Sequence, residues 1–212
     1  MIEEALFQSA HNALLFAFNF SGQQYERPMM NRMADDPVAY VSKGLSGMDG
    51  AAQAGMIMSR IMLLSPLSQY IVFAHYAPKA LACDCPRPCC AGKKPNELWE
   101  AVINKISRAS IAAATPGALS YRVLRDAIVR KMFGDTSHRG DVLAAAEKCG
   151  LEKRQAYNHQ AAIKLWLDGV KETKSKKGKI TPGVMGVRGI AFEQVDRLLV
   201  DSGIAGAVEL DF

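Results

Sequence analysis

The chain has 212 residues, of which 49% are apolar and 22% are charged. This length and apolar content allow one large domain or a core with a small appendage, and they exclude a disordered chain. The sequence has no run of eighteen uncharged apolar residues, and it opens with Met1-Ile2-Glu3-Glu4, which is acidic where a leader peptide is basic. We therefore expect a globular protein of the reducing cytoplasm that does not associate with a membrane.

The positive charge is concentrated in one segment. The formal net charge is +5, but residues 122–179 hold 14 Lys or Arg against 7 Asp or Glu, whereas the rest of the chain holds 12 basic and 14 acidic residues. Such an asymmetry favours a polyanionic or acidic partner, through counterion release and steering. A solvated basic face is the alternative interpretation.

The N-terminal half predicts helices separated by loops. A helix rich in Ala, Leu and Phe is expected over residues 3–20, followed by a loop of uncertain order. Two further helices are expected between Asp49 and Tyr76, because Ser65-Pro66 supplies an N-cap and a proline for the first turn of the second helix. We expect these two to form a helical hairpin whose inward side chains are Met56, Ile57, Ile61 and Leu64 on the first helix and Leu67, Tyr70, Ile71 and Ala74 on the second.

Two more helices follow a loop at residues 78–95. Asn96 is expected to cap the first, whose buried stripe would comprise Leu98, Trp99, Val102, Ile103 and Ile106. Ser120 is expected to cap the second, whose stripe would comprise Val123, Leu124, Ala127, Ile128 and Met132 before Gly134 ends it.

No segment shows convincing strand alternation, so the predicted fold class is all-α, a multi-helix core with a helix-turn-helix unit and a cysteine-rich loop insertion. We divide the chain into a helical core at 1–134 with the cysteine-rich loop at 78–95, a helix-turn-helix at 135–170, a basic linker at 171–189, and a small C-terminal helix with its tail at 190–212.

Residues 141–168 carry the strongest functional signal, because a short capped helix, a turn and a longer helix follow one another there. Ala145 and Ala146 allow the two helices to cross closely, Gly150 suits the positive φ of the turn, and Leu151 fills the angle between them. Inward positions of the second helix are Ala156, Ile163, Trp166 and Leu167, which leaves Lys153, Arg154, Gln155, Asn158 and Lys164 outward. An ordinary helical hairpin without a DNA role is the alternative.

If the unit binds DNA, its residue types suggest separate roles. Arg154 can pair with guanine, Gln155 or Asn158 with adenine, and Lys153 and Lys164 with phosphates. The tract from Lys171 to Lys179, with five lysines and one glutamate, then reads as a flexible basic arm that follows phosphates, or as a solvated linker.

Four cysteines are crowded into eight positions of the loop at 78–95. Thiolates satisfy tetrahedral zinc, so a structural zinc ion is predicted, with His75 or Cys149 able to replace one ligand of the set Cys83, Cys85, Cys89 and Cys90. The alternative is a cluster of reduced cysteines that pack in a tight turn, which Pro86 and Pro88 make rigid.

The sequence does not predict an enzyme. The zinc-deaminase pattern, a Gly-rich phosphate loop, a nucleophile elbow and a Cys-x-x-Cys redox motif are all absent from it. The four histidines are scattered along the chain, as expected of helix-face or cap residues.

Residues 44–168 resemble phage late-gene transcription antiterminators of the Q type, in the branch related to the lambdoid phage twenty-one protein. GLSGMDGAAQAGMIMSRIMLLSPLSQYIVFAHY is similar to that family's Asp-led helical pair, and DVLAAAEKCGLEKRQAYNHQAAIKLWL is similar to its helix-turn-helix, in the style of sigma-factor region 4. CDCPRPCCAGKKPNELW resembles a cysteine-bearing loop of phage and prophage DNA-binding proteins, but the paired Cys-x-x-Cys motifs of the lambda-type protein are missing.

The resemblance implies a protein that binds double-stranded DNA near a late promoter and engages a paused RNA polymerase holoenzyme, including its sigma factor, to allow terminator readthrough. Two other function classes stay open: a repressor or activator that acts by DNA binding alone, and a polymerase-interaction module without sequence-specific DNA binding. A repressor usually carries a dimerisation element, and no heptad pattern is present to provide one, which favours a DNA binder supported by a partner.

Overall fold

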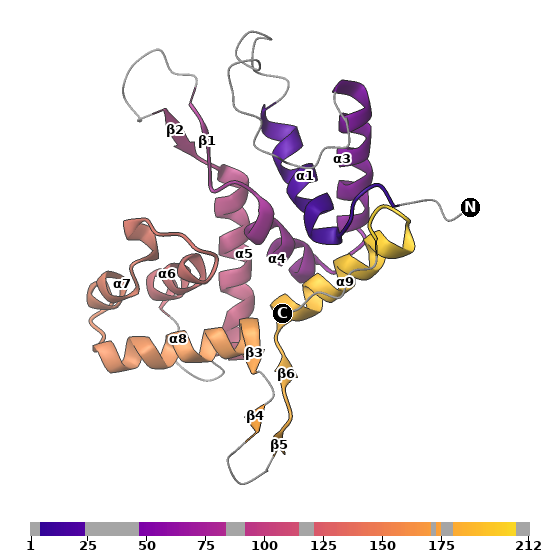
Figure 1. The fold of residues 1–212 in the computed structure, drawn as a ribbon. Helices are drawn as coiled ribbons and strands as arrows, with labels where there is room; N and C mark the ends of the chain where they lie inside the picture. Colours follow the sequence, from indigo (N-terminus) through magenta and orange to yellow (C-terminus); the bar gives the residue numbers. More distant parts are fainter. Residues whose placement is uncertain are drawn as a thin grey trace. The chain divides into compact units, whose positions relative to one another are not determined.

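The computed structural model describes residues 5–23, 47–83, 92–114, 121–170, 173–174 and 180–206, and this part of the chain is mostly helical, as predicted. The described helices are α1 (Ala10–Gln23), α3 (Gly47–Ile61), α4 (Pro66–Tyr76), α5 (Glu97–Ala114), α6 (Arg122–Met132), the 3-10 helix η1 (His138–Gly140), α7 (Val142–Lys148), α8 (Lys153–Asp168) and α9 (Val187–Asp201) (Figure 1). The described strands are β1 (Ala80–Ala82), β2 (Lys93–Pro95), β3 (Gly169–Val170), β4 (Thr173–Lys174), β5 (Ile180–Thr181) and β6 (Val184–Met185). None of the helices in these ranges combines the length and the apolar character needed to cross a bilayer.

The chain forms two compact units that differ from the predicted division at residue 134. Unit 1 comprises Met1–Ser65, Tyr76–Lys94 and Glu193–Phe212, and unit 2 comprises Pro66–His75 and Pro95–Phe192. α5 and α6 belong to the same unit as α7 and α8, with which they pack. The predicted hairpin of α3 and α4 is likewise divided, since these helices belong to different units.

In unit 1, α1 packs against α3, and residues 5–9, which precede α1, are not helical. The Phe7 amide donates to the Ile204 carbonyl at 3.0 Å, and the Phe7 carbonyl accepts from Gly206 at 2.8 Å. This bridge and the burial of the Phe7 ring override local helix propensity. The predicted helix start at residue 3 is therefore wrong, and α1 begins at Ala10.

The inward face of α3 is close to the predicted one, with one error. Ile57 and Ile61 are fully buried and Leu64 is buried just beyond the helix, but Met56 is half exposed. Met56 lies next to Ile57 in sequence, so the helical turn of 100° per residue carries it off the buried stripe.

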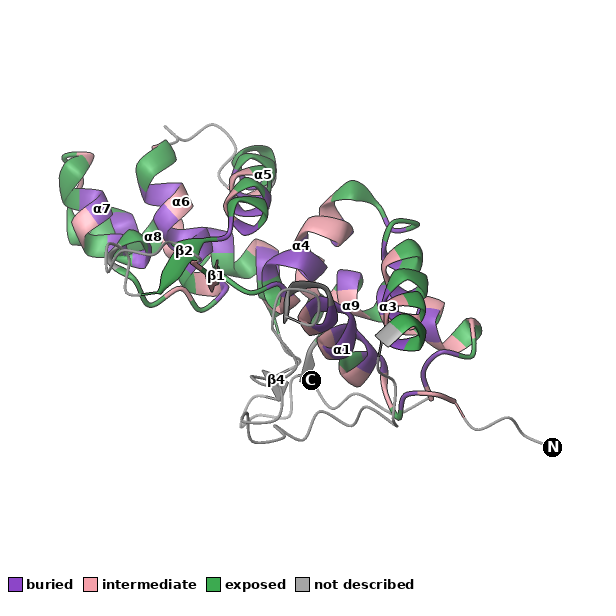
Figure 2. Ribbon diagram, turned by 90° about the horizontal axis from the view of Figure 1, so that it is seen from above, coloured by how far each residue is buried: buried purple, intermediate pink, exposed green. Residues whose placement is uncertain are grey.

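Unit 2 is built around a core of α5, α6, α7 and α8 (Figures 1 and 2). The Asn96 side chain caps α5 as predicted, accepting from the backbone amides of Leu98 and Trp99. Tyr121, not Ser120, is the N-cap residue of α6, and Ser120 lies outside the described residues. The other residues of the predicted stripes are buried, except that Leu98 and Val123 are about half exposed and Met132 is only partly buried.

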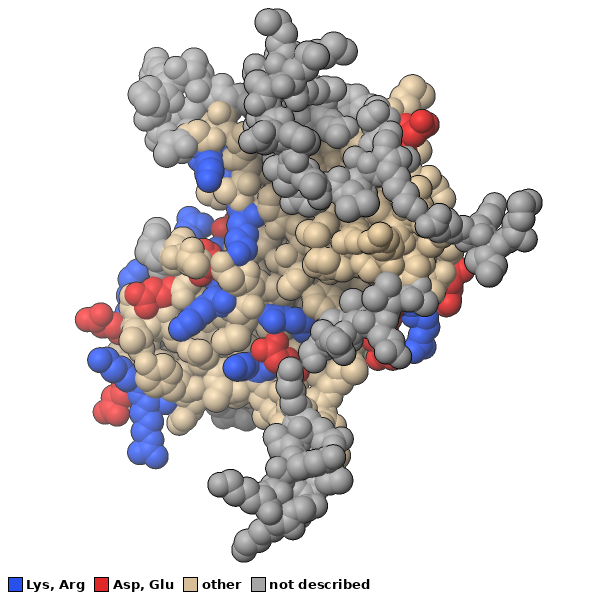
Figure 3. All heavy atoms as spheres, in the orientation of Figure 1, with Lys and Arg blue, Asp and Glu red and all other residues tan. Residues whose placement is uncertain are grey.

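Basic side chains gather on the surface of unit 2, where acidic ones are interspersed among them (Figure 3). Those that are exposed along α6, α7 and α8 and the loop between α6 and α7 are Arg122, Lys131, Arg139, Lys148, Lys153, Arg154 and Lys164.

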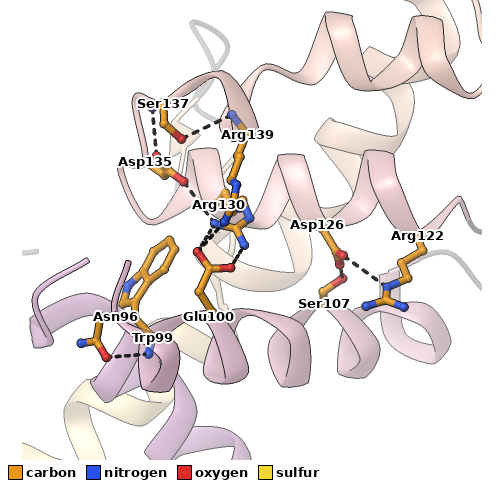
Figure 4. Close-up of polar contacts among 10 residues, drawn as sticks. All are labelled: Asn96, Trp99, Glu100, Ser107, Arg122, Asp126, Arg130, Asp135, Ser137 and Arg139. Atoms are coloured by element: carbon orange, nitrogen blue, oxygen red, sulfur yellow. Dashed lines mark hydrogen bonds and ion pairs between the residues drawn. The ribbon is translucent and has the colours of Figure 1, made fainter. Parts of the chain in front are cut away.

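A partly buried ion-pair network joins α5 to α6 and the loop that follows it (Figure 4). Arg130 of α6 pairs with Glu100 of α5 and, at 3.4 Å, with Asp135. Arg139 adds a second cation to Glu100 at 3.2 Å. The Arg130 guanidinium also lies 5.5 Å from the ring centre of Trp99, whose indole N–H donates to the Ala74 carbonyl. The network therefore fixes α6, the helix on which α7 and α8 pack.

Short strands and the first turn of α9 lie in the described part of residues 171–189, which the sequence analysis assigns to a basic linker. β3 pairs antiparallel with β6, and β4 pairs antiparallel with β5. The partners are Gly169↔Met185, Val170↔Val184, Thr173↔Thr181 and Lys174↔Ile180. The two pairings follow the same register, because the residue numbers of the partners have the same sum in all four pairs.

Replacing Glu100 with Gln should destabilise the protein in a pH-dependent way. The hydrogen bond from Arg130 is the largest cause of the lowered pKa of Glu100. The pair therefore stabilises the folded state above the ordinary pKa of 4.5, and this contribution is lost as the pH falls through the lowered folded-state value. We expect Glu100→Gln to lower the free energy of unfolding by about 1–3 kcal/mol at pH 7, as urea denaturation would measure.

The same variant should also lose less stability than the wild type when the pH drops from about 5 to about 3. Glu97→Gln, which removes an exposed carboxylate from the same helix, is the control and should change stability by less than about 0.5 kcal/mol. A Glu100→Gln protein as stable as the wild type over the whole range would contradict a structural role for the network.

Candidate nucleic-acid interface

α7 begins at a well-formed cap. The Asp141 carboxylate accepts from the backbone amides of Leu143 at 3.0 Å and Ala144 at 3.2 Å. Such a cap satisfies two of the amides that a helix start leaves without partners. Behind the cap, Ala145 and Ala146 are buried, as predicted.

Four residues, 149–152, join α7 to α8. Gly150 adopts a φ of +66°, the left-handed conformation that the sequence predicts for it. The amides of Gly150 and Leu151 donate back to the carbonyls of Glu147 and Ala146, each at 3.0 Å. The turn thereby satisfies the last carbonyls of α7 and fixes the direction in which α8 starts.

α8 starts with a reciprocal pair of caps. The Glu152 side chain accepts from the backbone at Gln155, and the Gln155 side-chain oxygen accepts from the Glu152 amide at 3.0 Å. This capping box satisfies two backbone donors at the helix start. It also engages the one side-chain oxygen with which Gln155 could accept a hydrogen bond from a ligand.

The opposite faces of α8 have distinct roles. Ala156, Ile163 and Leu167 are fully buried, as predicted, and Trp166 is only half-buried. α8 packs on α5, α6 and α7. All five residues predicted to face outward are exposed: Lys153, Arg154, Gln155, Asn158 and Lys164.

Only some of the residues predicted to face outward lie at the middle of the exposed side of α8. At 3.6 residues per turn, Arg154, Asn158, Ala161 and the exposed Leu165 follow one another along the middle of this face, and Lys153 and Lys164 lie toward one side of it. Gln155 lies at the other margin. We name the exposed surface of Lys153, Arg154, Tyr157, Asn158, Ala161, Lys164 and Leu165 the α8 face.

Sequence reasoning missed Tyr157 as a member of the α8 face. Its side chain is 53% exposed, three residues after Arg154 and four after Lys153. The available signal was this spacing, because a residue at i+3 or i+4 from two outward residues shares their side of a helix. The α8 face thus combines two cations, an amide and a phenol at its N-terminal end with a small residue, Ala161, at its centre.

The far end of α8 is anchored by Arg188 of α9. The Arg188 guanidinium pairs with Asp168 at 3.1 Å, donates to the Met132 carbonyl at 2.8 Å, and lies 4.8 Å from the ring centre of Phe133. Burial lowers the pKa of Arg188, while the charge of Asp168 opposes that shift. Asp168 is the one acidic residue in α8, so the pair also neutralises the helix's only negative charge.

The cysteine segment is described at its edges only. The Cys83 amide donates to the Gly92 carbonyl at 2.9 Å, beside the paired strands β1 and β2. Cys85, Cys89 and Cys90 lie outside the described residues, within which no group of three metal-binding side chains occurs. The zinc ion therefore stays a prediction.

Comparison of the chain with protein-family models, curated proteins and solved structures gives no match. The resemblance to Q-type antiterminators consequently stays a prediction from the sequence.

The two amide side chains at the start of α8 should differ in their effect on stability. Gln155→Ala opens the capping box and should lower the free energy of unfolding by about 0.5–1 kcal/mol. Asn158→Ala removes an exposed side chain and should change it by less than about 0.5 kcal/mol. Urea denaturation of both variants measures the difference. Equal stability of the two would contradict the capping role of Gln155.

Proposed function

We propose that this protein binds double-stranded DNA through a helix-turn-helix formed by α7 and α8, with α8 as the recognition helix. The observation that carries the proposal is the α8 face: an exposed and mainly polar and basic surface, with Leu165 at its centre, on a helix whose other side is buried against three helices. A helix must be held rigidly and must expose its first turns to enter a major groove, which is about 12 Å wide.

The residue types on the α8 face match the chemistry of base edges and phosphates. The Arg154 guanidinium can donate two parallel hydrogen bonds to guanine, and the Asn158 amide can both donate to and accept from adenine. Gln155 is the weaker candidate for adenine because its oxygen already accepts from the Glu152 amide. Lys153 and Lys164 suit phosphates, and Ala161 leaves room for close approach.

The finer proposal is a phage or prophage antiterminator that engages promoter DNA and paused RNA polymerase holoenzyme. Its support is the sequence resemblance of residues 44–168, together with the concentration of positive charge in residues 122–179. A structural zinc ion on the cysteines of the loop at 78–95 is part of the same proposal. Its support is that Cys83 follows β1 directly, beside the paired strands β1 and β2.

Substitutions on the α8 face should separate base reading from phosphate binding. Arg154→Ala should weaken binding to a duplex selected from a random library by about 1–3 kcal/mol and should relax its preference over a scrambled duplex. Lys153→Gln and Lys164→Gln should weaken binding to both duplexes alike and lower the salt dependence by roughly one unit each.

Fluorescence anisotropy at two salt concentrations measures these effects. Arg197→Ala is the matched control, because it removes an exposed arginine from α9, where its partner is Glu193. If Arg154→Ala leaves affinity for both duplexes unchanged, α8 is not part of a DNA interface.

A terminator-readthrough assay with purified polymerase tests the finer proposal. We expect added protein to increase transcription past a terminator only when the template carries its binding sequence near the promoter. A protein that blocked initiation instead would be a repressor, and readthrough on every template would indicate an interaction module without DNA specificity.

A further inference from the structure

The α8 face is apolar at its centre in the C-terminal half of the helix. Ala161 is exposed and Leu165 is 54% exposed, whereas the centre of the N-terminal half carries the polar side chains of Arg154 and Asn158. These four residues follow one another at spacings of four, three and four, so they lie along one line of the helix. Two of the four central positions therefore offer methyl groups and no hydrogen bond.

Two lysines indicate how far a DNA groove would follow α8. Lys153 and Lys164 lie on the same side of the central line, and eleven residues separate them, which is roughly 17 Å along the helix. Both suit phosphates, so the phosphates of one strand can flank α8 over this length. Asp168, one turn beyond Lys164, does not oppose this contact with an unpaired charge, because its carboxylate pairs with Arg188 at 3.1 Å. We therefore expect the central line to face base edges as far as Leu165.

The apolar half of the line restricts which bases can lie beneath it. Guanine and cytosine present only hydrogen-bonding groups in the major groove, and an apolar side chain that displaces their water leaves these groups without partners. Thymine is the one base that presents an apolar group there, the methyl on C5. Contact between this methyl and an aliphatic side chain buries apolar area on both molecules, which is favourable. The chemistry of Ala161 and Leu165 therefore favours thymine.

We propose that Ala161 and Leu165 recognise thymine through its C5 methyl group, in the part of the DNA site beyond the base pair that Asn158 contacts. This inference rests on the proposed function, because it takes the ligand of the α8 face to be duplex DNA. Ala161 lies about 4.5 Å and Leu165 about 10 Å beyond Asn158 along the helix. Base pairs follow one another at about 3.4 Å, so the two side chains reach roughly one and three base pairs further on.

The test compares two forms of one duplex that differ only in methyl groups. A fluorescent 30-base-pair duplex, selected from a random library with the full wild-type chain, is made once with thymine and once with uracil at every thymine position. We expect the wild type to bind the uracil duplex about fourfold more weakly for each methyl group that the two side chains cover. Fluorescence anisotropy measures both affinities.

A variant and a matched control assign this effect to the apolar half of the α8 face. Ala161→Ser/Leu165→Ser should bind the thymine and uracil duplexes with a ratio of affinities near one. Leu63→Ser removes a leucine that is 65% exposed in unit 1, outside α8, and should keep the wild-type ratio. Circular dichroism checks that the helices are intact.

Duplexes with uracil at single positions locate the effect with the unaltered protein. The thymines at which uracil weakens binding should lie within about three base pairs of the pair whose identity no longer matters to Asn158→Ala, and on one side of it. Sensitive thymines scattered over the duplex would contradict the proposal.

The remaining outcomes separate this proposal from the proposed function. A wild-type protein that binds no duplex overturns the proposed function and, with it, the thymine contact. A wild-type protein that binds the selected duplex equally well with thymine and uracil overturns the thymine contact alone. Equal weakening of the wild type and the double variant by uracil would assign the effect to the shape of the duplex, and would also overturn the contact. So would a double variant that keeps the wild-type ratio but no longer binds polymerase, because it would assign Ala161 and Leu165 to a protein partner.

Discussion

The structure of unit 2 depends on the burial of one side of α8. Ala156, Ile163 and Leu167 lose nearly all solvent contact against α5, α6 and α7. Burying a large aliphatic side chain is worth about 1.5–3 kcal/mol, so this stripe decides which side of α8 is inside. Every outward position of the α8 face follows from that choice, including Arg154 and Asn158.

Polar contacts then remove the remaining freedom of the elements around α8. Glu100 and Arg130 fix α6 against α5, and Arg188 fixes the end of α8 against α6 and the start of α9. These are partly or wholly buried charges, which are costly unless they are paired and hydrogen-bonded. Each is paired here, so the network specifies one arrangement of α6, α8 and the start of α9.

The sequence predicts much of unit 2 because its signals there are local. Helical spacing identifies the buried sides of α5, α6 and α8, and the types of Asn96, Asp141 and Gly150 identify caps and a turn. The outward residues of α8 follow from the same periodicity. Tyr157 was missed although the signal was present, since only charged and amide side chains were considered as ligands.

What the sequence does not predict comes from contacts between residues far apart in the chain. The bridge of Phe7 with Ala205 makes α1 shorter than the predicted helix, and no local pattern near residue 7 indicates this bridge. The strand pairs after α8 were not predicted, because the lysines and glycines of this segment have low strand propensity. The pairing of β3 with β6 depends on the close approach of Gly169 and Gly186 and on the ion pair of Arg188 with Asp168, and these residues meet only in the folded chain. The division into two units arises in the same way, from packing that joins α5 and α6 to α7 and α8.

The most direct test of the central claim is amide chemical-shift mapping of isotope-labelled protein titrated with duplex DNA. If the α8 face is the DNA interface, shifts should be largest in residues 153–165, with little change in α1 or α3. Saturable binding with shifts confined to other elements, or the absence of any shift at concentrations well above those of specific DNA binding, would contradict the account.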